Sequence, residues 1–148
     1  MGPLERFGAY AADFEKTFKD DDWSRLAQYF APDATYEVLG EPFACTLRGR
    51  DSIFAGIKKS LDGFDRRFAA REIALEGAPE VTGDAVSLAW SVTYRRPESP
   101  PFVLRGRSTA TYADGRIVRL VDAYDARAVD EFGSWLAVHG RDVNPSYV

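Results

Sequence analysis

The stretch that decides the fold is Gly115-Arg116-Ile117-Val118-Arg119-Leu120-Val121-Asp122-Ala123-Tyr124-Asp125. Asp114-Gly115 is a typical two-residue hairpin turn, so we predict that residues 102–112 and 116–124 are paired antiparallel strands. Counting by two from Val118 places Val118, Leu120, Asp122 and Tyr124 on one face. A carboxylate on an apolar strand face needs hydrogen-bond partners, and burial raises its pKa above about 3.9. Asp122 is therefore the first candidate for proton chemistry in an enclosed site.

The chain before this hairpin alternates between helical and strand patterns. Residues 85–96 alternate with a period of two, which puts Val86, Leu88, Trp90, Val92 and Tyr94 on one face, and residues 35–39 and 68–76 are shorter predicted strands. Helical spacing marks residues 4–18 and 51–64, with Asp51 as the cap of the second of these helices. A helix over 23–30 should end before Pro32, and Asp125 should cap a last helix through Leu136.

This order of elements predicts an α+β fold with a curved antiparallel sheet wrapped around helices. The concave face of such a sheet would hold a pocket. We expect one domain over residues 1–148, with a core at about 4–138 and an irregular tail at 139–148.

Composition narrows the possible functions. The chain has 19 basic and 23 acidic residues and a net charge of −4, which argues against a nucleic-acid-binding protein. Cys45 is the only cysteine, so no internal disulfide forms, and no segment has the length or pattern of a membrane span or signal peptide. We therefore expect a cytoplasmic protein. Helix capping explains Asp20-Asp21-Asp22 better than a metal does, and neither a metal nor an organic cofactor is implied.

A family resemblance rests on three stretches of the sequence. The chain is similar to the nuclear-transport-factor-2-like superfamily, in particular to its SnoaL-like branch, at Tyr29-Phe30-Ala31-Pro32-Asp33-Ala34-Thr35-Tyr36-Glu37-Val38, at Gly49-Arg50-Asp51 before a helix, and at residues 115–125. The resemblance implies a cone-shaped α+β barrel with a deep apolar pocket. It also implies a homodimer formed through the outer sheet face.

The superfamily includes ketosteroid isomerases, polyketide cyclases, dehydratases, limonene-type epoxide hydrolases and non-catalytic binders. The isomerase positions correspond here to Phe14, Val38 and Ser108, so that mechanism is not expected. Of the epoxide hydrolase positions, Asp122 and Tyr36 match, whereas Trp90, Val92 and Val38 replace the other three. The histidines of the dehydratases have no counterpart, because the lone His139 lies beyond the expected pocket.

These comparisons give a candidate site with Asp122 and Tyr36 as catalytic residues. Its expected ligand-binding walls are Phe14, Phe30, Val38, Phe64, Trp90, Val92, Tyr94, Ser108 and Tyr124. Three alternatives stay open: Asp122 is structural, Tyr36 is a core residue, or Trp90 and Tyr94 fill the cavity.

The resulting hypothesis is a pocket protein for a small hydrophobic molecule. If catalytic, it would be a cofactor-independent general acid–base enzyme (a cyclase, isomerase or hydratase/hydrolase) acting on a hydrophobic oxygenated metabolite. The alternative is a non-catalytic ligand-binding or dimeric assembly protein. The expected dimer face comprises Val103, Arg105, Arg107, Thr109, Thr111, Ile117, Arg119, Val121 and Ala123.

Overall fold

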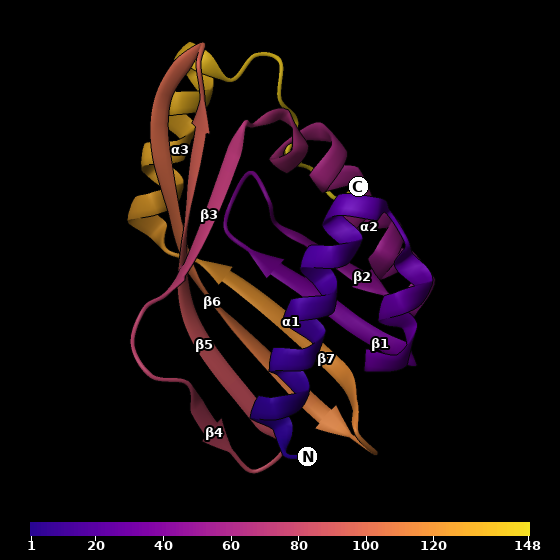
Figure 1. The fold of residues 1–148 in the computed structure, drawn as a ribbon. Coiled ribbons are helices and arrows are strands. Elements are labelled where there is room, and N and C mark those ends of the chain that lie inside the picture. The colour runs from indigo at the N-terminus through magenta and orange to yellow at the C-terminus, as the bar shows by residue number, and fades with distance from the viewer.

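The computed structural model describes every residue from Met1 to Val148. Its elements follow one another (Figure 1) as α1 (Pro3–Asp20), η1 (Trp23–Tyr29), β1 (Phe30–Leu39), β2 (Cys45–Arg48), α2 (Arg50–Gly63), η2 (Asp65–Arg67), β3 (Ala70–Leu75), β4 (Glu80–Thr82), β5 (Ala85–Arg96), β6 (Ser99–Ala113), β7 (Arg116–Tyr124) and α3 (Ala126–His139). The predicted α+β class is confirmed.

The strands form one curved, unclosed sheet in the order β2-β1-β7-β6-β5-β3, with β4 beside β5. The expectation of a wholly antiparallel sheet is wrong in one place, because β1 and β7 pair in parallel. Parallel neighbours need a long crossover connection, and here that connection is most of the chain. The other strand pairs are antiparallel.

The hairpin of β6 and β7 forms at Asp114-Gly115, where both residues have positive φ angles of 51° and 76°. The pairing of β6 with β7 is interrupted near this turn, which shifts the alternation of inward and outward side chains on β7. Thr111 pairs with Arg119 but Tyr112 pairs with Ile117, so Val118 is an extra residue in a β-bulge. Ile117 is therefore buried rather than part of the outer face, and the inward set on β7 starts at Ile117 and resumes at Leu120, without Val118.

Several element boundaries also differ from the sequence predictions. Pro32 lies inside β1 rather than after a helix, and the residues before it form a 3-10 helix. Asp51 lies in the first turn of α2, whose N-cap is Gly49, and strand β2 was not predicted. By contrast, Asp125 caps α3 as predicted, since its carboxylate accepts a hydrogen bond from the backbone N–H of Arg127.

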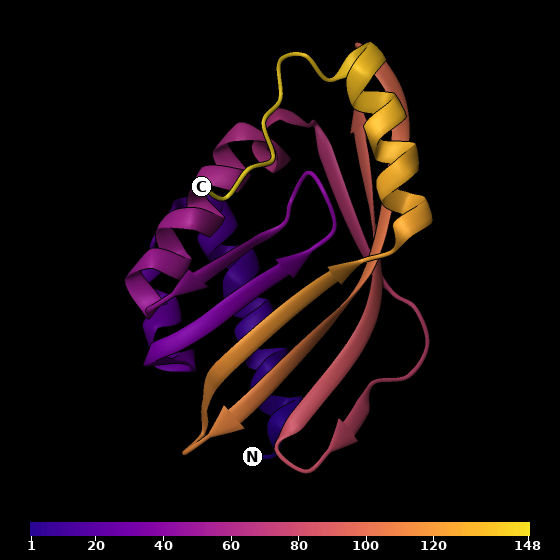
Figure 2. The ribbon, with the colours of Figure 1, turned by 180° about the vertical axis from the view of Figure 1, so that it is seen from behind.

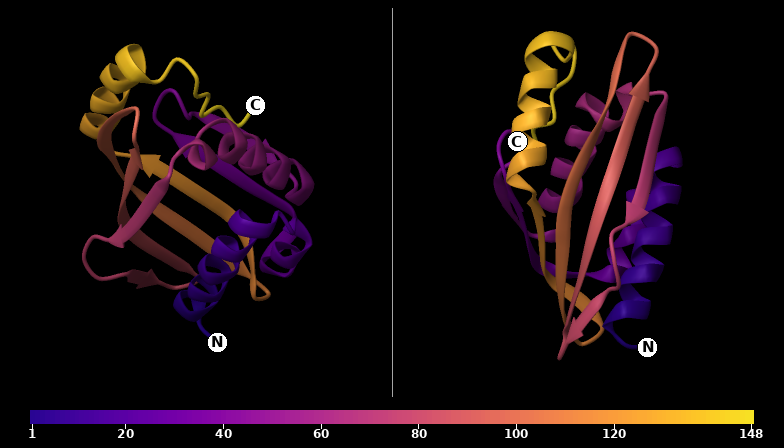
Figure 3. Two further views of the ribbon diagram at one scale, coloured as in Figure 1. Left: turned by 45° about the horizontal axis from the view of Figure 1, so that its top comes forward. Right: turned by 90° about the vertical axis from the view of Figure 1, so that its left-hand side faces the viewer.

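Helices α1 and α2 cover the concave face of the sheet, while α3 packs beside the far end of the β5–β6 hairpin (Figures 2 and 3). An aromatic cluster fills that end, with Phe64, Phe102 and Phe132 in mutual contact and Trp135 against Phe102. These rings close one end of the cone. No helix here combines the length and apolarity needed to cross a membrane.

The residues after α3 form neither helix nor strand, as predicted, but they return to α2 (Figure 2). The backbone N–H of Asn144 donates to the Gly63 carbonyl at 2.8 Å, and Ser60 Oγ donates to the Pro145 carbonyl at 2.7 Å. These contacts place the ring of Tyr147 against Tyr36, with centroids 5.8 Å apart. The packed core thus continues beyond residue 138.

Candidate functional site

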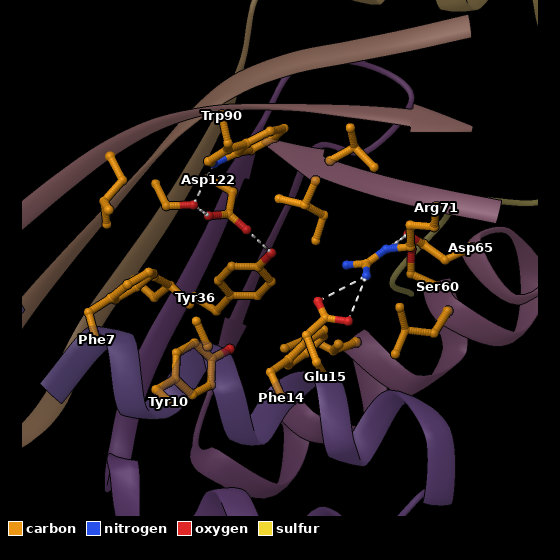
Figure 4. A pocket seen from close by; sticks show the side chains of 18 of the residues that line it. Phe7, Tyr10, Phe14, Glu15, Tyr36, Ser60, Asp65, Arg71, Trp90 and Asp122 are labelled. Atoms are coloured by element: carbon orange, nitrogen blue, oxygen red, sulfur yellow. Dashed lines mark hydrogen bonds and ion pairs between the residues drawn. The ribbon is translucent and has the colours of Figure 1, made fainter. Parts of the chain in front are cut away.

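A cavity of about 250 Å³ lies between α1 and the concave face of the sheet. Most of its wall is apolar, since 15 of its 21 lining residues are hydrophobic. Figure 4 shows that the polar side chains gather in two groups, with Asp122 and Tyr36 on one side of the view and Arg71, Asp65 and Glu15 on the other.

The first polar group draws on four neighbouring strands. Asp122 on β7 faces Ser108 on β6 directly in the register, and Ser108 Oγ donates to Asp122 Oδ1 at 2.6 Å. The Tyr36 hydroxyl on β1 donates to Asp122 Oδ2 at 2.5 Å. The Trp90 indole N–H on β5 donates to Ser108 Oγ at 2.8 Å, which directs the Ser108 proton toward the carboxylate.

These contacts have opposing effects on the protonation of Asp122. Burial raises its pKa above the ordinary value, whereas the hydrogen bonds from Ser108 and Tyr36 lower it, and the net shift is upward. Burial likewise raises the pKa of Tyr36 well above its ordinary value, and the negative charge of Asp122 adds to that rise. Tyr36 therefore stays protonated and acts as a hydrogen-bond donor.

The Trp90 indole lines the cavity without filling it, because the residue opposite Trp90 on β6 is a glycine. Its register partner is Gly106, and a Cβ at Gly106 would lie 2.7 Å from Trp90 Cη2. The missing side chain lets the indole lie close against β6 with its N–H on Ser108. Tyr94 does not line the cavity; it is buried in the core, and its hydroxyl donates to Asp65 Oδ2 at 2.9 Å.

The structure brings most of the predicted site residues to the cavity wall. Those that line it are Phe14, Tyr36, Trp90, Val92, Ser108, Asp122 and Tyr124. Four do not: Phe30, Val38, Phe64 and Tyr94 are buried in the surrounding core. Val38 and Tyr94 were expected there from predicted strands, and Phe30 and Phe64 from predicted helices. Periodicity can identify an inward face, but it cannot tell which part of that face another side chain covers.

Sequence reasoning missed the second polar group. Arg71 Nε donates to Asp65 Oδ2 at 3.0 Å, and Nη1 donates to Glu15 Oε1 and Oε2 at 3.0 and 3.2 Å. Burial works against the charge on Arg71, but the negative charge of Asp65 raises its pKa above the ordinary value. Burial raises the pKa of Asp65 too, while Arg71 and the Tyr94 hydroxyl limit the rise.

Among the cavity residues that were missed, Arg71 gave a weak signal in the sequence and Tyr147 gave none. Period-two counting along residues 68–76 places Arg71 on the same face as Ile73 and Leu75, so a charge on an apolar strand face was visible there as it was at Asp122. Tyr147 gave no signal, because an irregular tail carries no periodicity that would place it at a cavity.

The cavity opens beside β3, an edge strand of the sheet. Ile73 and Leu75 line the cavity, yet they are 48% and 60% exposed. Apolar side chains that are both exposed and part of a cavity wall mark its rim. The opening therefore lies between β3 and the α1 residues Phe7, Ala11 and Phe14. No group of three His, Cys, Asp or Glu side chains is placed to hold a metal ion.

The curved sheet packed against α1 and α2 is a nuclear-transport-factor-2-like fold, and solved structures share it. A nuclear-transport-factor-2-like protein from Burkholderia thailandensis is 20% identical, with a TM-score of 0.67 over 88% of this chain and 96% of that one. TerC, co-crystallised with polyporic acid, is 21% identical, with a TM-score of 0.64 over 87% and 95%. Bal32a, from a soil-derived mobile gene cassette, is 19% identical, with a TM-score of 0.66 over 88% and 98%.

The family assignment comes from the sequence. The profile of the SnoaL-like domain matches residues 11–120, so the chain belongs to the SnoaL-like domain family. The matched range ends two residues before Asp122. None of the curated proteins compared with the chain matches it.

Proposed function

We propose that this SnoaL-like protein is a cofactor-independent enzyme that moves a proton on a hydrophobic, oxygenated small molecule, with Asp122 as the acid–base group. The observation that carries the proposal is the state of Asp122 in the cavity wall. It is a desolvated carboxylate whose two oxygens are each held by a hydroxyl donor, at 2.5 and 2.6 Å.

Asp122 remains able to accept a proton in this arrangement. Each carboxylate oxygen has two acceptor positions, and Tyr36 and Ser108 use one on each oxygen. Because burial raises the pKa of Asp122, its ionised form is a stronger base than a carboxylate in water. The two donors hold the carboxylate in one orientation, which is what proton transfer to a bound molecule requires.

Tyr36 has a second role in this proposal. Its protonated hydroxyl beside the reacting carboxylate can donate to an oxygen of the ligand on which negative charge develops. An Asp–Tyr pair of this kind suits removal of a proton next to a carbonyl, as in cyclisation or isomerisation, and also activation of a water for hydration. The co-crystal of TerC with polyporic acid supports a small organic compound as the ligand class for this fold.

Exchange of carbon-bound protons tests the proposal without knowledge of the natural substrate. 2-Tetralone, a neutral bicyclic ketone, would be incubated with the protein in D2O, and the loss of its α-proton signals followed by NMR. We expect exchange above the buffer rate with the natural sequence and a decrease of about 100-fold or more with Asp122→Asn. Asp130→Asn on the exposed side of α3 is the matched control and should leave the rate unchanged.

The alternative function is a non-catalytic binder. It would be favoured if ligand-detected NMR showed 2-tetralone in the cavity while exchange with the natural sequence stayed at the buffer rate. The homodimer also remains a proposal. Val103 and Val121 are half-buried on the outer face of β6 and β7 and support it. Sedimentation velocity would then give twice the chain mass of 16.5 kDa, and Val121→Lys would shift the particles to one chain.

A further inference from the structure

The cavity has a hydrogen-bond donor at the end away from Asp122. Arg71 uses Nε for Asp65 and Nη1 for Glu15, but its Nη2 donates to no atom of the protein. Arg71 is a cavity-lining residue, and Figure 4 shows the unpaired guanidinium nitrogen directed toward the side on which Tyr36 and Asp122 lie. A donor directed into an apolar cavity is suited to a ligand atom that accepts a hydrogen bond.

The position of this donor is well fixed. The Arg71 side chain is only 14% exposed, and its guanidinium lies over the Phe18 ring, 4.8 Å from the centroid. Asp65, itself held by the Tyr94 hydroxyl, fixes one edge of the guanidinium and Glu15 fixes another. The planar guanidinium therefore holds Nη2 in one direction and does not reorient to suit the position of a ligand.

The charges around Arg71 decide what kind of atom it can hold. One guanidinium is paired with two carboxylates, so this group carries a net negative charge, and Asp122 adds another negative charge at the other end when it is ionised. Neither end of the cavity attracts an anion. A carboxylate on the ligand would be repelled at both ends, whereas a neutral carbonyl oxygen can accept from Nη2 without that penalty.

We propose that Arg71 is a specificity-determining residue, which donates through Nη2 to a neutral carbonyl oxygen at the far end of a hydrophobic ring ligand. This inference rests on the proposed function, because it takes the reacting end of the same ligand to lie at Asp122 and Tyr36. It assigns the substrate to neutral ring compounds that carry oxygen at two separated positions. It excludes ring compounds with a carboxylate at the end opposite the reacting group.

A matched pair of probes tests this assignment. Both are 2-tetralones substituted at carbon 6, one with an acetyl group and the other with a carboxylate, and their dissociation constants would be measured by calorimetry. With the natural sequence, the acetyl compound should bind about tenfold more tightly than the carboxylate. Binding of the carboxylate as tightly as the acetyl compound, or more tightly, would overturn the proposal.

Glu15→Gln is the sharpest variant. Glu15 lies on α1 with its side chain 46% exposed, so the change removes one negative charge without leaving a buried charge unpaired. The carboxylate probe should then bind several-fold more tightly, with the acetyl probe little affected. Glu5→Gln makes the same change of charge on the same helix outside the cavity and should alter neither affinity. An unchanged carboxylate affinity in Glu15→Gln would also overturn the assignment.

A spectroscopic measurement detects the hydrogen bond itself. The stretching band of a ¹³C-labelled acetyl carbonyl should move to lower frequency on binding. Arg71→Lys, which keeps a cation beside Asp65, should abolish most of that movement, because one ammonium cannot replace the planar set of donors. If the band does not move in the natural sequence, the donor is not Arg71.

The two proposals can fail separately. If the acetyl probe binds with the carbonyl shift but its ring α-protons do not exchange, the acid–base function fails and the role of Arg71 as a binding residue stands. If Asp122-dependent exchange occurs while the carbonyl band and the Glu15→Gln affinities do not respond, only the assignment of Arg71 fails.

Discussion

The Tyr36 hydroxyl lies 2.5 Å from Asp122 Oδ2, although 85 residues separate the two along the chain. The parallel pairing of β1 with β7 accounts for this proximity. Tyr36 pairs with Leu120 and Val38 pairs with Asp122, so the tyrosine and the acid lie two positions apart on one face of adjacent strands. In this position, the hydrogen bonds from neighbouring hydroxyls change the pKa of the Asp122 carboxylate, and so its strength as a base.

Replacing Tyr36 should therefore change the pH dependence of proton exchange. Exchange needs ionised Asp122, so its rate should rise with pH through the Asp122 pKa, which lies above 3.8. The hydrogen bond from Tyr36 lowers that pKa, so Tyr36→Phe should move the acid limb to higher pH. The measurement is the pH profile of 2-tetralone exchange. Tyr29→Phe removes a hydroxyl from Asp13 outside the cavity and should leave the profile in place, whereas a limb at lower pH in Tyr36→Phe would contradict the prediction.

Gly106→Ala should destabilise the protein and displace Trp90. The new Cβ would lie 2.6 Å from the Ala123 carbonyl oxygen and 2.7 Å from Trp90 Cη2, so the indole must move away from Ser108. We expect the free energy of unfolding, measured with urea, to fall by about 1–3 kcal/mol. Gly8→Ala on α1 meets no atom within 4 Å and should instead increase stability by about 0.5–1 kcal/mol. Equal effects of the two changes would show that Trp90 is not held against β6.

The hydrogen bond from Tyr94 to Asp65 should contribute stability that depends on pH. This bond lowers the pKa of the buried carboxyl, so its contribution is present when Asp65 is ionised and is lost as pH falls through the Asp65 pKa. At neutral pH, Tyr94→Phe should reduce the free energy of unfolding by about 1–2 kcal/mol, with a smaller loss at acid pH. Tyr112→Phe is the control, because the buried Tyr112 hydroxyl has no partner and its removal should cost nothing. A loss in Tyr94→Phe that grew toward acid pH would contradict this account.

Gly63→Ala should release the C-terminal tail from the cavity. A Cβ at Gly63 would lie 2.2 Å from the Asn144 carbonyl oxygen, so the tail and the end of α2 cannot keep their contact. Faster hydrogen–deuterium exchange around Tyr147, followed by mass spectrometry, would report the release. Gly133→Ala on α3 has no atom within 4 Å of the new carbon and should leave exchange in the tail unchanged. Continued protection of the tail in Gly63→Ala would show that Ser60 and Pro145 hold it alone.

The sequence predicted much of the fold because most of the strands obey simple alternation. On β5, Val86, Leu88, Val92 and Tyr94 are buried as the period of two requires, and the strand has its predicted bounds. Ile117 was placed on the wrong face because one bulged residue, Val118, reverses the alternation. Periodicity contains no signal for such an insertion. The pairing of β1 with β7 was also missed, because it joins distant segments.

The candidate site was predictable where a charge interrupts an apolar face, as at Asp122. The same interruption at Arg71 was visible but carried no obvious partner, because Glu15 and Asp65 come from α1 and from the turn after α2. Which inward residues reach the cavity depends on the packing of the aromatic cluster. Phe64 and Tyr94, for example, pack against each other in the core rather than at the wall.

The two polar ends of the cavity lie on different kinds of strand, one central in the sheet and the other at its edge. Asp122 lies on β7, which has bonded neighbours on both sides, whereas Arg71 lies on β3, which is bonded only to β5. An edge strand tolerates sequence change better than a central one, because fewer neighbours must adjust with it. Mutation along β3 could thus change which molecules the cavity accepts while the Asp122–Tyr36 pair stays intact, which makes this edge the place to begin redesigning its selectivity.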